Sequence, residues 1–365
     1  MQISEIIKTI EDFAPLALQE SWDNAGLSVG DGENNVAAAL LCLDVTSEVL
    51  DEAISKGAGL VISHHPVIFR GLKKLTGSDP TERIVLKAIR NNIALYAAHT
   101  NIDKIWGGVN SRIAGKIGLK NQEILNPEGG ILRKLIVFVP EEHASKVREA
   151  IFSSGAGNIG EYDHCSFNIS GEGSFRGSDI TDPFAGRPGV MHFEKEIRIE
   201  TIFPAFLENR IIKSMIEAHP YEEVAYDIYT LGNRWDQAGI GMAGELEKPL
   251  ETDAFLDKLR SVFKTGVIRH SRPTGKKIAR VAVCGGSGSS LIHAARKSGA
   301  DVYVSGDFKY HDFFGADSGF MIADIGHFES EQFTMEIFND LLTKKFPNFA
   351  VHFSNVNTNP IHYFK

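Results

Sequence analysis

The stretch AAALLCLDVTSEVLDEAISKGAGLVISHHP, residues 37–66, decides the fold. An apolar run that ends at Asp44 predicts a buried strand, and a helix is predicted to begin near Ser47. A second apolar run ends at Ser63 and predicts another buried strand. Strand–helix–strand units of this length usually place their strands parallel in one sheet, with a right-handed crossover. We therefore expect an α/β fold.

The same order of elements returns far downstream in RVAVCGGSGSSLIHAARKSGADVYVSGDFKYHD, residues 280–312. Here the first strand is predicted to end at Cys284 and the second at Ser305, with a helix between them. The segments KGAGLVIS and SGADVYVS align residue for residue, which places Asp307 opposite His65. An internal repeat of this kind predicts two similar α/β lobes that form a split core.

Histidines and acidic residues stand at the carboxyl ends of the predicted strands. They are His64 and His65 in the first copy, His99 and Asp103 after its next strand, and His327 and Glu331 after the corresponding strand of the second copy. In each His-x-x-x-acid pair the side chains are four residues apart, so on a helix they share one face. Open α/β sheets bind ligands at the carboxyl edges of their strands. If the lobes face each other, these side chains converge on one site. Taken singly, each histidine could instead have a structural role.

This set of side chains favours a metal site. A shell of His, Asp and Glu without thiolates suits zinc, which we favour, and also manganese or iron(II). The number of donors is sufficient for two divalent ions with a bridging carboxylate. Such a site lowers the pKa of bound water and makes hydroxide available near neutral pH, so hydrolysis is the natural chemistry.

The segment between the two copies has a different character. Residues 132–231 read as strand, helix, two strands, helix and strand, which is the ferredoxin-like order. We expect an α+β domain inserted between the lobes. The predicted division is residues 1–128 for the first core lobe, 129–240 for the inserted domain and 241–365 for the second core lobe.

Three further motifs allow more than one interpretation. The turn CGGSGSS precedes a predicted helix, and Ser287 and Gly288 could contact an anion; the alternative is a tight turn with a serine N-cap. Asp23, in SWDNAGLSVGD, either faces a substrate, supports a ligand or simply forms a turn. HPYEEVAYDIY, from His219, is predicted to serve the fold or an interface rather than catalysis.

Composition excludes several classes of function. The formal net charge of −9 argues against a nucleic-acid partner, because non-specific binding of nucleic acid needs a positively charged surface. No apolar stretch approaches the roughly 20 residues that a membrane helix needs. The 3 cysteines have no paired spacing, which indicates neither a disulfide framework nor a cysteine metal site. Residues 1–15, MQISEIIKTIEDFAP, predict an acidic amphipathic helix rather than a signal peptide, so we expect a cytoplasmic protein without a membrane partner.

The motifs WDNAGL, SHHP, AAHTNID, CGGSGSS, SGDFKYHD and DIGHFESEQ together resemble the Nif-three-like family, whose bacterial members are named GTP cyclohydrolase 1 type 2 homologs. The resemblance covers essentially the whole chain. It implies a two-lobed α/β core with a dinuclear metal site whose ligands are His64, His65, Asp103, His327 and Glu331. His99 is then either a further ligand or a group that supports one.

The resemblance also has implications for the central segment and for assembly. Residues 132–231 resemble the PII/CutA-like domain of the longer family members, with HPYEEVAYDIY as the clearest signature. Family members form hexameric toroids, so the resemblance implies a homo-oligomer, with a hexamer expected.

Three functions are compatible with these observations. The leading hypothesis is a metal-dependent hydrolase acting on a nucleotide-like substrate, with GTP ring opening by metal-bound hydroxide as the family name suggests. A metal-dependent phosphoesterase would use the same water on a phosphate. The third alternative is a non-enzymatic, metal-binding regulatory or scaffold protein.

Overall fold

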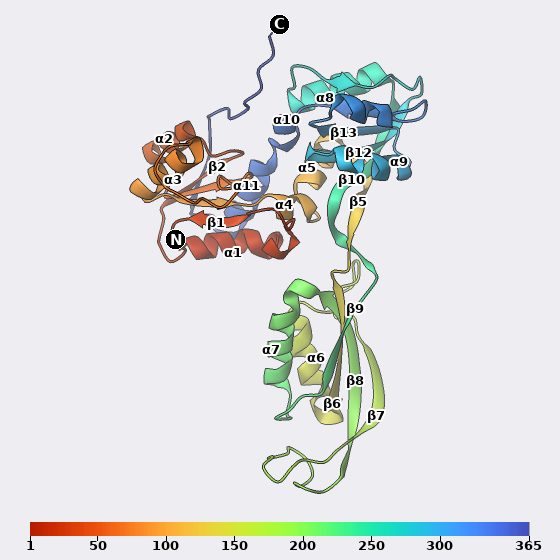
Figure 1. The fold of residues 1–365 in the computed structure, drawn as a ribbon. Coiled ribbons are helices and arrows are strands. Elements are labelled where there is room, and N and C mark those ends of the chain that lie inside the picture. Colours follow the sequence, from red (N-terminus) through yellow and green to blue (C-terminus); the bar gives the residue numbers. More distant parts are fainter. Residues whose placement is uncertain (365) are drawn as a thin grey trace. The chain divides into compact units, whose positions relative to one another are not determined.

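The computed structural model describes residues 1–364 and shows a mixed α/β fold with three β-sheets (Figure 1). The chain divides into two compact units. The larger unit is formed by Met1–Pro127 together with the chain from Gln237 onward, and the smaller by Glu128–Asp236. None of the helices in the described part of the chain is long and apolar enough to span a membrane.

The first sheet of the larger unit has five strands, namely β1 (Gly26–Val29), β2 (Ala38–Cys42), β3 (Leu60–Ser63), β4 (Ala94–Ala97) and β15 (Ala350–Phe353). Their order in the sheet is β1-β4-β3-β2-β15. β1 is antiparallel to β4, and the other neighbouring strands are parallel. Every residue of β2, β3 and β4 is buried, as expected for apolar strands that are covered on both faces.

The helices associated with this sheet are α1 (Ile3–Phe13), α2 (Ser47–Ser55), α3 (Pro80–Arg90), α4 (Thr100–Lys104) and α11 (Thr334–Lys345), whereas α5 (Val109–Ile117) packs against β12 (Ile278–Ser287) of the second sheet. Their starts follow from local sequence. The side chain of Thr46 accepts a hydrogen bond from the Val49 amide and caps α2. Asp79 caps α3 in the same way, and Pro80 occupies its first turn, where a missing N–H costs nothing.

The second sheet has six strands, namely β5 (Leu119–Gly129), β10 (Arg234–Leu250), β11 (Arg269–His270), β12 (Ile278–Ser287), β13 (Val302–Gly306) and β14 (Met321–Asp324). Their order is β11-β14-β13-β12-β10-β5. β12, β13 and β14 are parallel, like β2, β3 and β4 in the first sheet. Three further helices accompany this sheet: α8 (Thr252–Phe263), α9 (Ile292–Lys297) and α10 (His327–Glu331).

The two sheets differ from the predicted segmentation at their edges. β5, which falls within the predicted first lobe, lies at the edge of the second sheet, and β15, from the predicted second lobe, pairs with β2 in the first sheet. β12 also continues beyond Cys284 to Ser287, which pairs with Gly306. One hydrophobic cluster contains buried residues of both sheets, including Ile62 and Val283.

The smaller unit consists of β6 (Leu132–Pro140), α6 (Ala144–Ser153), β7 (Phe167–Phe175), β8 (His192–Pro204), α7 (Glu208–Ala218) and β9 (Tyr226–Thr230). Its strands form an antiparallel sheet in the order β7-β8-β6-β9. Both helices cover one face of this sheet (Figure 1), and their apolar residues form a core with Leu135, Val137 and Ile199. Because side chains alternate along a strand, Phe138 and Arg198 lie on the opposite, helix-free face.

Candidate metal centre

His64 and His65 follow β3, and each is held by a group at the end of a neighbouring parallel strand. His64 is fully buried, and its Nδ1 lies 3.0 Å from the carbonyl oxygen of Ala98, just after β4. Nδ1 of His65 lies 2.8 Å from the carboxylate of Asp44, just after β2. A carbonyl oxygen only accepts hydrogen bonds, so Nδ1 of His64 carries a proton that it donates to this oxygen. In the neutral ring, Nε2 then presents a lone pair to the interior.

His99 stands between β4 and α4, and Asp23 orients it. Nδ1 of His99 lies 2.7 Å from Oδ1 of Asp23. Oδ2 of Asp23 accepts hydrogen bonds from the Thr100 amide at 3.1 Å and from the Thr100 hydroxyl at 2.5 Å. Burial raises the pKa of Asp23, but the hydrogen bonds from His99 and Thr100 outweigh burial and lower this pKa to about 2. Asp23 is therefore an ionised group that fixes the ring of His99.

The second repeat copy contributes His327 and Glu331 from α10. Nδ1 of His327 lies 2.7 Å from Oδ2 of Asp307, which follows β13. Glu331 is one helical turn further on, and its Oε2 lies 3.0 Å from Nε2 of His327. Asp307 aligns with His65 in the repeat. The first copy thus uses this position for an imidazole, and the second uses it for the carboxylate that orients an imidazole.

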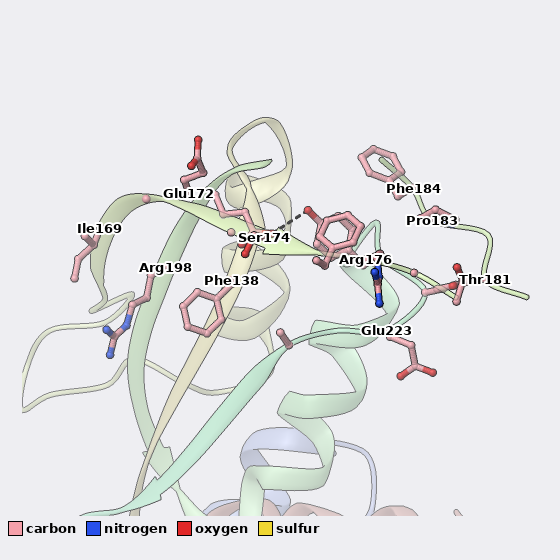
Figure 2. Close-up of a pocket in the computed structure, with 18 residues that line it drawn as sticks. Phe138, Ile169, Glu172, Ser174, Arg176, Thr181, Pro183, Phe184, Arg198 and Glu223 are labelled. Carbon is pink, nitrogen blue, oxygen red and sulfur yellow. Dashed lines mark hydrogen bonds between the residues drawn. The ribbon is translucent and has the colours of Figure 1, made fainter. Parts of the chain in front are cut away.

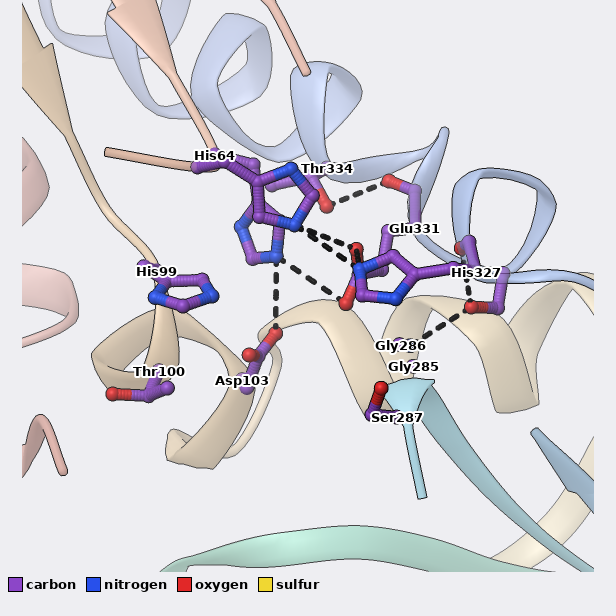
Figure 3. Close-up of polar contacts among 12 residues, drawn as sticks. His64, His99, Thr100, Asp103, Gly285, Gly286, Ser287, His327, Glu331 and Thr334 are labelled. Atoms are coloured by element: carbon purple, nitrogen blue, oxygen red, sulfur yellow. Dashed lines mark hydrogen bonds and ion pairs between the residues drawn. The ribbon is translucent and has the colours of Figure 1, made fainter. Parts of the chain in front are cut away.

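The side chains from both copies meet at one place (Figure 3). Oε2 of Glu331 lies 3.1 Å from Nε2 of His65, and Oε1 of Glu331 lies 3.5 Å from Nε2 of His64. Oδ1 of Asp103 lies 3.7 Å from Nε2 of His64. The two Nε2 atoms of His65 and His327 are 3.2 Å apart.

The chemistry of these donors fits a metal ion. Nε2 of His64 and Oδ1 of Asp103 are buried without a hydrogen-bond partner, and Oε2 of Glu331 has only the imidazoles of His65 and His327 at ion-pair distance. Leaving one buried polar atom unsatisfied costs about 1–3 kcal/mol, and a divalent cation would satisfy several such atoms at once. The ligand atoms form three groups, each within 4.8 Å: His65, His327 and Glu331; His64, Asp103 and Glu331; and His64, His65 and His99.

Protons compete with a metal for two of these nitrogens. Burial lowers the pKa of His65, but Asp44 and Glu331 outweigh burial and raise this pKa to about 10. Burial also lowers the pKa of His327, but Glu331 and Asp307 outweigh it and raise the pKa to about 9. A metal must displace these protons, so metal affinity is expected to rise with pH through the neutral range.

The glycine-rich turn after Cys284 packs directly against the cluster. Gly286 has a φ of +62°, and a Cβ at this position would collide with the Glu331 carboxylate. The Gly285 amide donates to the Asn110 side chain at 2.9 Å, and the Gly286 amide donates to the Ser330 hydroxyl at 2.9 Å. Close packing against Glu331 therefore accounts for these two glycines.

Ser287 and Gly288 lie beside the same turn. The Ser287 hydroxyl donates to Asp307 at 2.6 Å, and the Gly288 carbonyl accepts from the Tyr303 hydroxyl at 2.8 Å. The expected helix is preceded by a 3-10 turn, Ser289–Leu291, and neither this turn nor α9 has a side-chain cap. The serine N-cap is thus not formed in this described segment, and an anion contact by Ser287 and Gly288 stays a prediction.

A cavity of about 530 Å³ opens beside the cluster, and His65, His99 and His327 line it. Trp22 and Phe69 also line this cavity, with exposed fractions of 57% and 49%. Their rings are stacked, with centroids 5.8 Å apart and an interplanar angle of 24°. Each ring also meets His99 in an edge-to-face contact. The cavity therefore has an exposed aromatic pair close to the candidate ligands.

The structure brings together all six predicted His and carboxylate residues, and it adds groups that sequence reasoning missed. Asp44 and Asp307 each hold Nδ1 of a histidine of the cluster. Each follows closely on a buried parallel strand. An aspartate just after a buried strand is the sequence feature that could have indicated this role. The neighbouring residues do not indicate which histidine the aspartate contacts.

The HPYEEVAYDIY motif lies in the smaller unit. Nε2 of His219 lies 3.0 Å from the Phe138 carbonyl oxygen, and Nδ1 accepts the Tyr221 amide at 3.1 Å. The Tyr221 hydroxyl donates to Glu196 at 2.9 Å. These contacts join the end of α7 to the sheet.

The fold and the site together define a mixed α/β protein with a His/carboxylate cluster that could hold a metal ion. The family described as Duf34/NIF3 (NGG1p interacting factor 3) matches residues 1–360, and the chain belongs to this family. The resemblance to the Nif-three-like family that the sequence motifs carry is thereby confirmed.

Named relatives and solved structures agree with this assignment. The chain is 38% identical over 362 residues to a Bacillus subtilis (strain 168) protein named GTP cyclohydrolase 1 type 2 homolog, with 98% of this chain and 97% of that protein covered. A crystal structure described as a Bacillus cereus protein related to NIF3 is similar with a TM-score of 0.86 and 38% identity, covering 100% of this chain and 99% of that chain. A Staphylococcus aureus protein matches with a TM-score of 0.79 and 29% identity, covering 100% of this chain and 99% of that chain.

Proposed function

We propose that this protein is a metal-dependent hydrolase that holds two divalent ions and acts on a nucleotide-like substrate. One observation carries this proposal: Glu331 belongs to two ligand groups, one with His65 and His327 and one with His64 and Asp103. A carboxylate shared in this way suits a pair of ions with one bridging ligand. Zinc is the ion we favour, and manganese or iron(II) would accept the same donors.

A divalent ion in such a site lowers the pKa of the water it binds and so supplies a nucleophile near neutral pH. The residues of the chain hold and orient the ligands. Asp44 and Asp307 accept the Nδ1 protons of His65 and His327, which directs both Nε2 atoms inward. His99 is held by Asp23 and lines the cavity, so we assign it the transfer of a proton at Nε2.

Two observations support a nucleotide-like substrate. Relatives covering nearly the whole chain carry the name GTP cyclohydrolase 1 type 2 homolog. The exposed faces of Trp22 and Phe69 beside the cavity suit a planar base, since stacking of a base on an aromatic side chain contributes about 1–3 kcal/mol. Hydrolysis of one C8–N bond with one water would open the guanine imidazole ring and leave C8 as a formamide, and hydrolysis of the second C8–N bond with another water would release formate.

The test is to incubate purified, metal-loaded protein with GTP and to measure formate and phosphate separately. Formate supports ring opening. Phosphate without formate identifies a phosphoesterase, and neither product at any metal loading identifies a metal-binding regulatory or scaffold protein. The Asp103→Ala variant is the control, because product made by the site must fall to background when a ligand is removed.

We further propose that the larger unit is a two-lobed core and that the smaller unit is an inserted ferredoxin-like domain of the PII/CutA-like type. The parallel β2-α2-β3 and β12-α9-β13 units support the first part. The element order β6-α6-β7-β8-α7-β9 and the strand order β7-β8-β6-β9 support the second. Deletion of residues 132–231 with a flexible linker should leave a metal-binding core, and an insoluble product with several linkers would contradict this division.

We also propose a cytoplasmic homohexamer, on the strength of the family resemblance. Phe167 and Tyr229 support self-association, because they are 66% and 54% exposed on the helix-free face of the smaller unit's sheet. Light scattering on the purified protein tests the hexamer, and cell fractionation tests the location.

A further inference from the structure

The smaller unit contains a cavity of about 570 Å³, which is within the size range of small-molecule sites. It lies on the helix-free face of the sheet, next to the loop that joins β7 to β8 (Figure 2). Nothing in the proposed hydrolase reaction uses it. Its main side chains are Phe138, Phe175, Phe184, Glu196, Arg198 and Tyr221.

A buried carboxylate lies in the floor of this cavity. Glu196 is only 9% exposed, and its Oε1 accepts a hydrogen bond of 2.9 Å from the Tyr221 hydroxyl. The Glu196 side chain is one of those that line the cavity. The backbone also makes room for this carboxylate, because a Cβ on Gly173 would collide with it. A carboxylate oxygen that faces a cavity only accepts hydrogen bonds, and a cationic donor bonds it more strongly than a neutral one, so the site favours a cation.

Aromatic rings surround this carboxylate. The ring centroids of Phe175 and Tyr221 are 5.8 Å apart, and those of Phe184 and Tyr221 are 6.1 Å apart. Phe138 adds a further ring to the lining. Faces of aromatic rings attract cations and also accommodate an apolar skeleton.

The charges of the lining favour a positive ligand as well. The lining contains four carboxylates, contributed by Glu172, Glu196, Glu222 and Glu223, and two guanidinium groups, those of Arg176 and Arg198. One guanidinium nitrogen of Arg198 pairs with Glu200 at 2.8 Å, while its Nε is buried without a hydrogen-bond partner among residues 1–364. The four carboxylates of the lining outnumber its two guanidinium groups.

The wall formed by the β7–β8 loop is held in place. The Asp182 amide donates to the Glu222 carboxylate at 3.2 Å, and the Gly189 amide donates to the Gly177 carbonyl at 2.8 Å. Phe184, on the same loop, makes an edge-to-face contact with His143. The cavity thus has a formed wall opposite the sheet.

We propose that this cavity binds a protonated organic amine with an aromatic or apolar skeleton. The ammonium group is placed on Glu196, and the skeleton lies among Phe138, Phe175 and Tyr221. This site is independent of the metal centre, and the proposal does not rest on the proposed hydrolase function.

Three ligands that share one skeleton test the proposal on the full-length, metal-loaded protein. Phenethylamine is the cation, 2-phenylethanol the neutral analogue and phenylacetate the anion, and calorimetric titration measures each affinity. We expect saturable binding of the amine, at least about tenfold tighter than that of the alcohol, because a charge-assisted hydrogen bond is about twice as strong as a neutral one. Stronger binding of phenylacetate would overturn the proposal in favour of an anion site, and so would binding of none of the three.

Two variants and a control locate the binding. Glu196→Gln keeps an acceptor for Tyr221 and should weaken amine binding at least about tenfold. Gly171→Leu should block the cavity without strain, because no atom lies within 4 Å of a Cβ built there. Glu217→Gln removes the same charge from an exposed position on α7, outside the cavity, and should leave affinity unchanged.

Thermal unfolding of each variant shows whether the smaller unit is intact. If Glu196→Gln does not fold, Gly171→Leu decides the question by itself. Unchanged amine affinity in a folded variant of either kind would show that the amine binds elsewhere and would overturn the proposal.

Discussion

The replacement Glu331→Gln in metal-free protein tests the electrostatics of the cluster. The Glu331 side chain is only 4% exposed and lies within about 3 Å of Nε2 of both His65 and His327. At pH 7 both imidazoles are protonated in the metal-free protein, because Glu331 and a second carboxylate raise their pKa values to about 10 and about 9. Glutamine keeps the volume of the side chain and removes the charge that these imidazoles face.

The expected loss of stability follows from this burial. Removing one partner of a buried ion pair costs about 3–5 kcal/mol. The variant can avoid an unpaired charge if His65 loses its proton. Deprotonating a group with a pKa of about 10 at pH 7 costs about 4 kcal/mol, at 1.36 kcal/mol per unit, and this is the upper limit of the expected loss. We therefore expect Glu331→Gln to lower the free energy of unfolding by about 3–4 kcal/mol at pH 7.

The pH dependence has a defined sign. A histidine whose pKa is raised by folding stabilises the folded state fully below its unfolded pKa of about 6.5, and this contribution is lost as the pH rises through the folded pKa. For His65 the folded pKa is about 10, so the difference between the variant and the unsubstituted protein should be large at pH 7 and small at pH 10.

Urea unfolding in the presence of a chelator, followed by fluorescence at both pH values, measures this difference. The control is Glu336→Gln on α11, whose 35% exposed side chain pairs with Lys116 at 2.8 Å and with Arg112 at 3.6 Å and whose loss should cost less than about 1 kcal/mol. Equal stability of Glu331→Gln and the unsubstituted protein at pH 7, or an equal loss at pH 7 and pH 10, would refute the reasoning.

Three further predictions concern metal binding. Asp307→Asn should weaken metal affinity about 10–100-fold without emptying a position, because Asp307 orients a ligand, and titration of chelator-stripped protein measures this. Asp103→Ala should lower the metal content by about one ion and Glu331→Ala by more, since Glu331 belongs to two ligand groups; equal losses by elemental mass spectrometry would contradict the shared role. Gly286→Ala should weaken metal affinity because its Cβ meets Glu331. The matched control is Gly275→Ala, which has a similar positive φ in open space; equal effects of the two would assign the loss to backbone strain.

The predictions from sequence are closest where the signal is local. β3 ends at Ser63 and α2 begins at Ser47, as the apolar run and the predicted start of the helix indicate. The four-residue spacing of His327 and Glu331 lies within one short helix, as expected. The end of β12 was missed, because CGGSGSS reads as a turn, whereas pairing with Gly306 extends the strand to Ser287.

The sequence by itself determined the repeated strand–helix–strand order and the residue types that cluster at strand ends, because hydrophobic period and i,i+4 spacing are properties of neighbouring residues. Only the tertiary structure decided which group holds each imidazole: Asp23 meets His99 across 76 positions of sequence, and no spacing rule connects them. The tertiary structure also decided that β5, from the predicted first lobe, joins the second sheet and that β15, from the predicted second lobe, joins the first sheet. An apolar pattern records that a strand is buried, but the identity of its neighbour depends on which sheet edge the folded chain brings within reach.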